Sequence, residues 1–400
     1  MSKPVVGIMK RDLTNGNITR SIIHLAWPTT LAMILQTSFN IIDTIFVGRV
    51  SPHAIAAVSM VFPVVFLMFA LASGIGVGTV SIIARYLGSK NYRRAESAAQ
   101  NTFLLAGIMS IFFTFMGLLF QKPVFVLMGA SHDILNMVIS YSTWIFAGST
   151  FIFFFIASAS VLRGEGDMKT PMRIMVISVI INTLLDPILI FGVGNFPGFG
   201  VRGAAIATVV SRAVGCILIV RYVLNGNALV KISFKKINYN PSMVRNILSV
   251  GLPTSINQVM MSLGTILLIR IVSMFGSNAI ASFGLGVRLD QVAILPSLGI
   301  ATAVITLVGH NMGAKKFIRA KSITFKAAVF AMTIIGVIAA LYFAIPEVWI
   351  RIFTRDYKVI SYTTSYLRIV SLSYIFIAVS YTHLRAHETR HDLVCRLLLE

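Results

Sequence analysis

Apolar residues occur along this 400-residue chain in blocks of about 20. A helix of that length crosses the ~30 Å hydrocarbon core of a bilayer. Composition agrees, because 56% of the residues are hydrophobic and only 12% are charged, and the mean hydropathy is +0.85. A soluble protein of this size could not cover so much apolar surface. The sequence therefore predicts an all-α polytopic membrane protein and excludes a soluble enzyme, a secreted scaffold and a disordered chain.

Basic residues are distributed unevenly over the two sides of the predicted membrane protein. Connections that alternate from the N-terminus contain 21 Lys and Arg residues, and the opposite connections contain 6. Because basic residues are enriched in cytoplasmic loops, the N-terminus is predicted to be cytoplasmic. The net charge of +21 has the same origin, so we expect no nucleic-acid partner. The expected location is the cytoplasmic (plasma) membrane, which is the inner membrane of a bacterial cell. The predicted spans are 22–47, 54–83, 98–120, 137–161, 172–194, 203–222, 247–273, 279–308, 323–345 and 362–380.

The chain aligns with itself at an offset of 225 residues without a gap. The matches fall on prolines, glycines and loop charges rather than on interchangeable Leu and Ile. They include Pro28 with Pro253 and Tyr141 with Tyr366. An even number of spans per repeat predicts two parallel lobes, related by an axis along the membrane normal, as in transporters that rock around a central site.

The repeat defines the expected domains. These are a cytoplasmic segment (1–20), an N-lobe with spans 1–6 (21–224), a cytoplasmic linker (225–246), an incomplete C-lobe with spans 7–10 (247–379) and a tail (380–400). The tail does not continue the repeat and resembles translated adapter sequence, so we expect it to be foreign. For that reason the helical spacing of its histidines, His383, His387 and His391, is not read as a metal site.

Acidic residues inside a bilayer are expensive, at ~2.5–3.5 kcal/mol or more, and therefore point to function. Asp43 shares a helix face with Asn40, and Asp186 shares one with Asn182. Two carboxylates gathered with amide oxygens would hold a proton between them or bind Na⁺ through oxygen ligands. The alternative is two unrelated structural acids whose hydrogen bonds come from neighbouring donors.

Three further features carry expectations. Asp43 corresponds to Leu268 at the repeat offset, so coupling chemistry is expected in the first lobe. Asp290 either lines the central cavity or pairs with a neighbouring helix. Pro28 removes a backbone hydrogen bond in the first span, where it forms a hinge or a static kink. The glycine run 74–78 predicts close helix packing rather than a nucleotide-binding loop.

Several motifs resemble the multidrug and toxic compound extrusion (MATE) family. They are Asn40–Arg49, Leu162–Pro171, Asn182–Pro187 and Gly200–Arg212. The resemblance covers about 10–380. It implies twelve spans in two six-helix lobes, about ten of which are present here, forming a V-shaped exporter driven by H⁺ or Na⁺. The family's cation site in the first lobe matches Asp43, Asn182 and Asp186, with Tyr141 and Thr208 as neighbours. The region that carries an acid in span 7 of some members is Gln258–Met261 here, without a carboxylate.

The expected function is export of lipophilic, often cationic, drugs and toxic compounds by alternating access, with H⁺ or Na⁺ as the coupling ion. A lipid-linked sugar flippase is the main alternative. An enzyme is not expected, nor a channel, because neither an intramembrane catalytic cluster nor a pore filter is visible. No cofactor and no structural metal are expected, and the partners are small molecules and the bilayer, with the chain as a monomer. The expected substrate cavity includes Gln36, Asn40, Met260, Met261 and Asp290.

Overall fold

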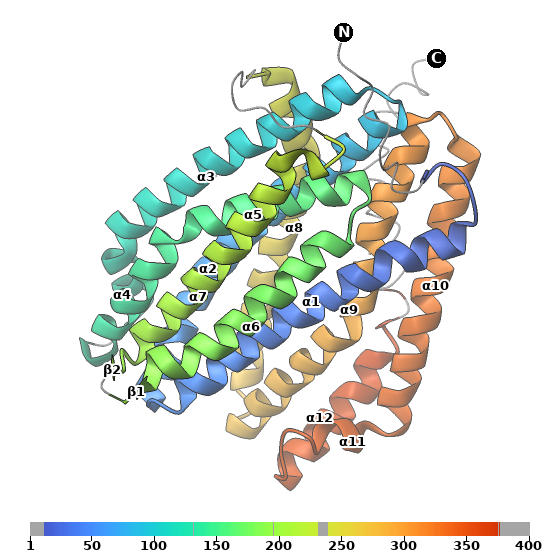
Figure 1. Ribbon diagram of the computed structural model, residues 1–400. Coiled ribbons are helices and arrows are strands. Elements are labelled where there is room, and N and C mark those ends of the chain that lie inside the picture. Colours follow the sequence, from blue (N-terminus) through green and yellow to red (C-terminus); the bar gives the residue numbers. More distant parts are fainter. Residues whose placement is uncertain (1–11, 131, 195, 231–238, 375, 377–400) are drawn as a thin grey trace. The chain divides into compact units, whose positions relative to one another are not determined.

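Long helices dominate the computed structural model, which describes residues 12–130, 132–194, 196–230, 239–374 and 376 (Figure 1). The helices of the first half are α1 (Ile18–Gly48), α2 (Pro52–Gly88), α3 (Tyr92–Leu127), α4 (His132–Ala147), α5 (Ser149–Glu165), α6 (Lys169–Phe191) and α7 (Val201–Tyr222). A short π-helical turn, η1 (Val223–Asn227), follows α7. The second half contains α8 (Pro241–Ser273), α9 (Ser277–Gly313), α10 (Phe317–Ala344), α11 (Pro346–Ile350) and α12 (Tyr357–Ser371). The two-residue strands β1 (Gly192–Val193) and β2 (Phe196–Pro197) pair as a hairpin between α6 and α7.

Eight of the described helices are long and apolar enough to cross a membrane. A ninth span forms if α4 and α5, which meet at a bend of 43°, are counted together. The predicted all-α polytopic class is therefore confirmed, and the chain is a multi-pass membrane protein. The predicted span 362–380 corresponds to α12, which has 15 residues, and its remainder extends into residues outside the described part.

The break between α4 and α5 was not predicted, because hydropathy indicated one continuous span at 137–161. It falls at Gly148, where an added Cβ would lie 2.6 Å from a methyl group of Val209. The absence of a side chain at Gly148 lets α7 approach the bend closely. Close packing against α7 therefore accounts for the glycine at the bend.

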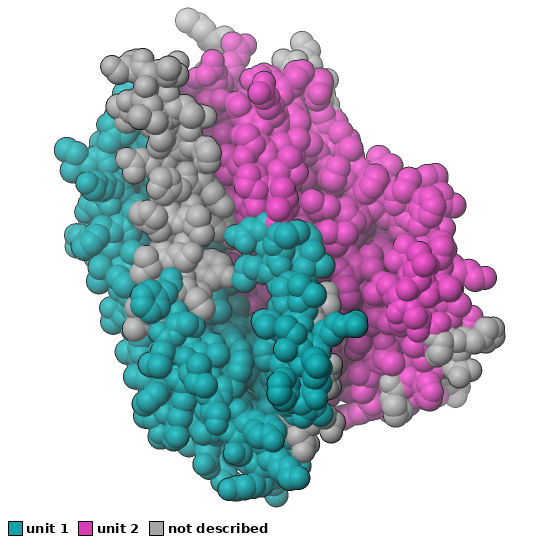
Figure 2. Space-filling model, turned by 180° about the vertical axis from the view of Figure 1, so that it is seen from behind, with its two compact units in different colours: residues 1–30, 88–90, 257–400 teal, residues 31–87, 91–256 magenta. Residues whose placement is uncertain are grey.

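The structure separates into two compact units, coloured in Figure 2. Unit 1 comprises residues 1–30, 88–90 and 257–400, and unit 2 comprises residues 31–87 and 91–256. The divisions fall inside α1 and α8 rather than in the predicted linker 225–246. The predicted lobe boundaries stay a prediction, and the predicted tail 380–400 lies outside the described residues.

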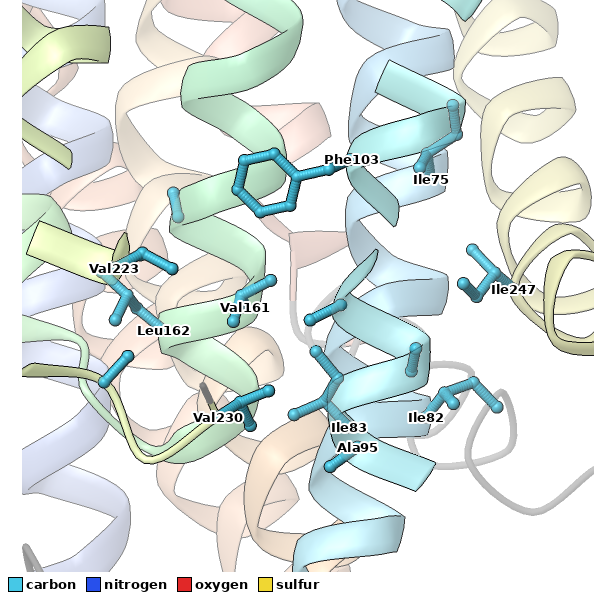
Figure 3. Close-up of a cluster of buried hydrophobic side chains, with 14 of the residues drawn as sticks. Ile75, Ile82, Ile83, Ala95, Phe103, Val161, Leu162, Val223, Val230 and Ile247 are labelled. Carbon is cyan, nitrogen blue, oxygen red and sulfur yellow. The ribbon is translucent and has the colours of Figure 1, made fainter. Parts of the chain in front are cut away.

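Hydrophobic clusters hold unit 2 together. One cluster joins α2, α3 and α5 to the start of α8, with Ile83, Phe103, Leu162 and Ile247 among its members (Figure 3). A second joins α1, α2, α4, α6 and α7 around Val47, Val61, Val138, Ile190 and Val201. In unit 1, α9 packs along α10 and α12. Within unit 2, these clusters bury part of the surface of α1 to α7 and the start of α8.

The predicted close packing at the glycine run is confirmed. A Cβ at Gly74 would lie 2.5 Å from the carbonyl oxygen of Gly251, and one at Gly78 would lie 2.2 Å from that of Ile247. Both distances are shorter than any Cβ–oxygen contact, so only glycine allows α2 to lie this close to the backbone of α8.

The internal repeat recurs in the turn geometry. Among the described residues, only Lys90 and Lys315 have positive φ without being glycine, with φ values of 58° and 59°. The two lysines are equivalent at the offset of 225 and lie in the α2–α3 and α9–α10 connections. Two independent turns with the same uncommon backbone conformation indicate that the repeat is structural.

Candidate functional site

All five residues of the predicted cation site are buried in unit 2. Asp43 comes from α1, Tyr141 from α4, Asn182 and Asp186 from α6, and Thr208 from α7. Asn182 and Asp186 have no exposed surface, and the other three are each 7% exposed. Four helices therefore carry polar side chains into the apolar interior of one unit.

Two carboxyl groups interact within this site. Asp186 lies close enough to Asp43 for the two carboxylates to repel each other electrostatically. Tyr141 interacts with both of them, and Asp43 also interacts with Arg212. The sequence predicted that the two acids meet, and the structure places them in one electrostatic cluster.

Four buried oxygen atoms in this cluster have no hydrogen-bond partner among the described residues. They are Oδ1 of Asp43, Oδ1 of Asn182, Oδ2 of Asp186 and Oγ1 of Thr208. Unit 2 has one other buried side-chain atom of this kind in its described part, on Ser158. A buried polar atom without a partner costs ~1–3 kcal/mol. Four such oxygens at the predicted site match what a small hard cation requires, namely oxygen ligands without competing donors.

Arg212 is a charged member of the cluster that the sequence reasoning missed. Its guanidinium lies over the rings of Phe39 and Phe69, 5.0 Å from each ring centroid. It also interacts electrostatically with Asp43 and Tyr141. An arginine in the middle of the apolar span 203–222 was the signal that could have identified it, by the same cost argument that selected the acids.

The five residues expected in the substrate cavity divide between the two units. Gln36 and Asn40 lie on the unit 2 part of α1, half-buried and exposed respectively, and Met260 and Met261 lie on α8 in unit 1, each more than half exposed. Their role in a cavity stays a prediction.

Asp290, the fifth of these residues, pairs with neighbouring residues of unit 1, as one of the two alternatives left open by the sequence predicted. The hydroxyl of Tyr366 donates to Oδ2 of Asp290 at 2.6 Å, and the hydroxyl of Tyr374 donates to Oδ1. Tyr342 packs beside this group, with its ring 6.2 Å from that of Tyr374. Tyr366 is the repeat equivalent of Tyr141, and each of the two tyrosines lies beside an acid. The two acids are not equivalent, because Asp43 lies on α1, the first helix of its half, and Asp290 lies on α9, the second helix of its half.

This chain is similar to known proteins in sequence and in fold. The MatE family model matches residues 28–188 and 253–386, two ranges whose starts are 225 residues apart. A protein of Shewanella oneidensis named FAD transporter is 27% identical over 98% of this chain and 88% of its own length. A protein of Thermotoga maritima named probable multidrug resistance protein NorM is 29% identical over 91% of this chain and 78% of its own length.

A solved structure has the same fold. It is described as the outward-facing conformation of a multidrug resistance MATE family transporter of the MOP superfamily. It superposes with a TM-score of 0.89 at 29% identity, over 94% of this chain and 84% of that one. With the family match on both repeats and a buried acidic site in the first, the chain belongs to the MatE family of multidrug and toxic compound extrusion transporters.

Proposed function

We propose that this protein is a cation-coupled antiporter that exports lipophilic, often cationic, compounds by alternating access. The observation that carries the proposal is the set of four buried oxygens without partners on Asp43, Asn182, Asp186 and Thr208. A bound cation would supply the interactions that these oxygens lack, which supports cation binding at one stage of the cycle.

The charges of the site indicate a single monovalent ion. Two ionised carboxylates, Asp43 and Asp186, and one guanidinium, Arg212, leave a net charge of −1. One H⁺ or one Na⁺ neutralises that charge, and a neutral site is the cheapest to hold inside the bilayer. The expected stoichiometry is therefore one coupling ion per cycle.

The ligand set favours Na⁺ over H⁺ as the coupling ion. A proton on either carboxylate satisfies one oxygen and leaves the remaining ones without partners. A sodium ion accepts several oxygen ligands at once, including the neutral oxygens of Asn182 and Thr208. Asp43 and Asp186 alone would be sufficient for a proton site, so the two neutral residues are the discriminating feature.

The substrate class is proposed from charge. The first relative above is named as a transporter of FAD and the second as a probable multidrug resistance protein. An acidic site in the N-lobe attracts organic cations and repels an anionic dinucleotide, so cations are the first candidates and FAD is the second. The flippase alternative is not favoured, because the relatives are named for drugs or FAD and not for lipid-linked sugars.

Ion and substrate are expected to compete through α1. Neutralising the carboxylates removes their mutual repulsion, so α1 packs closer to α6 by bending at Pro28, and the space for a bound cation shrinks. By thermodynamic reciprocity, the substrate weakens ion binding by the same factor, and couplings of this kind are typically ~1–3 kcal/mol. Expulsion of the substrate and capture of the ion are then one event.

Everted membrane vesicles test the proposal. We expect a fluorescent organic cation to accumulate inside vesicles loaded with Na⁺, because ion efflux into low-Na⁺ buffer drives uptake. A second set with an acidic interior measures H⁺ coupling, and FAD replaces the cation in a third. Vesicles containing Asp43→Asn serve as the control. Cation uptake that is independent of both ion gradients contradicts the antiport mechanism.

A further inference from the structure

A polar pocket of about 490 Å³ lies in unit 2, at the end of α2, the start of α3 and the start of α8. Its lining includes Arg93, Arg94, Asn91, Asn240 and Asn246. Two of the lining residues are positively charged and none is acidic. The transport site described above uses none of these residues.

Two helices begin at this pocket. Asn91 caps α3, because its Oδ1 accepts a hydrogen bond from the backbone nitrogen of Arg94 at 3.2 Å. Asn240 precedes α8, and its Oδ1 accepts from the backbone nitrogen of Met243 at 3.1 Å. The positive ends of two helix dipoles thus add to the charge of the two arginines. The local field favours an anion.

The pocket lies beside a buried hydrophobic cluster, and a hydrogen bond joins two of the segments that line it. Met243, which lines it, belongs to the same buried cluster as Ala95 and Ile247, shown in Figure 3. The backbone nitrogen of Asn240 donates to Oδ1 of Asn101 on α3 at 3.0 Å, which ties the start of α8 to α3. The guanidinium of Arg94 lies 5.9 Å from the ring centroid of Tyr86. These contacts fix the start of α8 against α3 and place Arg94 beside Tyr86 before any ligand arrives.

In the second repeat, the residues equivalent to Asn91 and Arg94 donate hydrogen bonds to oxygen atoms of the chain itself. Arg319, the equivalent of Arg94, donates to the carbonyl oxygen of Gly16 at 2.8 Å. Lys316, the equivalent of Asn91, donates to Oδ1 of Asn15 at 2.7 Å and to the carbonyl oxygen of Thr14 at 3.1 Å. In unit 1 the oxygens for the basic groups thus come from the segment before α1. In unit 2, Arg94 lines the pocket instead, and no hydrogen bond from its guanidinium to a backbone carbonyl is found among the described residues.

We infer that this pocket binds the phosphate group of an anionic phospholipid. Phosphate supplies the oxygen acceptors that the backbone supplies in the other repeat, and it matches the planar donors of arginine. The pocket lies at one end of three helices that are each long and apolar enough to cross the bilayer, beyond the ~30 Å hydrocarbon core. Basic pockets between the ends of transmembrane helices are suited to anionic headgroups.

Lipid binding to the purified full-length protein tests this inference. Delipidated protein in detergent is titrated with short-chain phosphatidylglycerol, short-chain phosphatidylcholine or inorganic phosphate, and bound species are counted by native mass spectrometry. We expect phosphatidylglycerol to bind most tightly. Arg93→Gln and Arg94→Gln should each weaken it by about tenfold or more, because each removes charge-assisted hydrogen bonds.

Arg245→Gln is the matched control. Arg245 is exposed near the same end of α8, one residue from Asn246, and does not line the pocket. Its removal should change binding by about twofold or less, since it costs only screened long-range attraction. Arg93→Lys with Arg94→Lys retains the charge and should bind more tightly than the double glutamine variant. Equal losses in Arg93→Gln and Arg245→Gln overturn the site, and equal binding of inorganic phosphate overturns its assignment to a lipid.

Discussion

The side-chain amide of Asn182 donates a hydrogen bond to Oδ1 of Asp186, with 3.1 Å between nitrogen and oxygen. The two residues are one turn apart on α6, so the bond fixes which way the amide faces. With its nitrogen committed to Asp186, the amide presents its oxygen as an acceptor, and that oxygen has no other partner in the described chain. In the proposed cation site, Asn182 would therefore have two roles: it holds one carboxylate and offers its oxygen as a neutral ligand.

Asp43 is the only carboxylate that α1 brings to this site, and the second repeat has Leu268 at the equivalent position. Asp43→Asn makes the net charge of the site zero, so the coupling ion is no longer required for neutrality. We expect export to fall to background while insertion and abundance stay normal. Resistance to a toxic organic cation, measured beside membrane abundance, checks this, and full resistance at normal abundance contradicts it.

Arg212→Gln changes the site charge in the opposite direction, from −1 to −2. We expect the variant to bind a second monovalent cation, or to bind the first about tenfold or more tightly, and to release it too slowly for transport. Binding of radioactive Na⁺ to purified protein measures both the number of ions and their affinity.

The matched control for that prediction is Arg202→Gln. Arg202 lies at the start of the same helix, with its guanidinium 5.5 Å from the ring centroid of Trp144. Its loss removes a similar cation–π contact without changing the acidic site. Identical ion binding in the two variants would show that Arg212 has no electrostatic role there.

Most of the fold could be predicted from sequence because the bilayer restricts the options. Apolar length predicted nine of the helical spans, and the offset of 225 predicted that the connection at Lys90 would be repeated at Lys315. The close approach at Gly148 could not be predicted, because it involves Val209, which lies 61 positions further along the chain. A contact between distant segments leaves no mark on local hydropathy.

The acidic residues of the site could be predicted because burying a charged side chain in the bilayer costs free energy and therefore points to function. Burial of Asp43 and Asp186 is expensive, and both were selected for that reason. Burial of the charged Arg212 side chain is also expensive. It was missed because basic residues served in the sequence only to identify cytoplasmic loops. The pairing of Asp290 with Tyr366 and Tyr374 required knowledge of which helix faces α9, and the repeat alone did not provide it.

Gly78→Ala should destabilise the protein. The new Cβ would lie 2.2 Å from the carbonyl oxygen of Ile247, and backbone cannot move aside as a flexible side chain can. Overpacking of this kind costs about 1–3 kcal/mol. Gly264→Ala is the control, because that helical glycine on α8 has nothing within 4 Å of the added atom. The unfolding temperatures in detergent should differ clearly, and equal temperatures contradict the close approach of α2 and α8.

Tyr374→Phe tests the pairing at Asp290. The ring is fully buried, and loss of its hydroxyl removes a charge-assisted hydrogen bond worth about 1.5–3 kcal/mol. Tyr362→Phe on α12 is the control, because Tyr362 is 54% exposed. We expect a lower unfolding temperature for the first variant only. If transport by Tyr374→Phe falls while its stability is unchanged, Asp290 has a functional role in addition to its structural one.

Pro28→Ala should uncouple ion binding from transport. α1 passes from unit 1 to unit 2 between Thr30 and Leu31, two residues after this proline, so a bend at Pro28 moves the segment that carries Asp43. Alanine restores the missing backbone hydrogen bond and stiffens the helix. We expect the variant to keep substrate and ion affinity within about threefold, because no ligand is lost, while export falls by at least about tenfold since the conformational step is blocked.

Pro253→Ala supplies the comparison. It removes the equivalent proline from α8, which crosses between the units at 256–257 but carries Leu268 where α1 carries Asp43. If the bend matters because it moves a carboxylate, Pro253→Ala should retain most of its export activity.

Substrate affinity measured across pH separates the outcomes further. Protonation of the carboxylates weakens binding of a cationic substrate, so affinity should fall as pH falls in both proline variants, whereas Asp186→Asn should flatten that dependence. Loss of export in both proline variants would assign the bend to movement of the two units and not to the ion site.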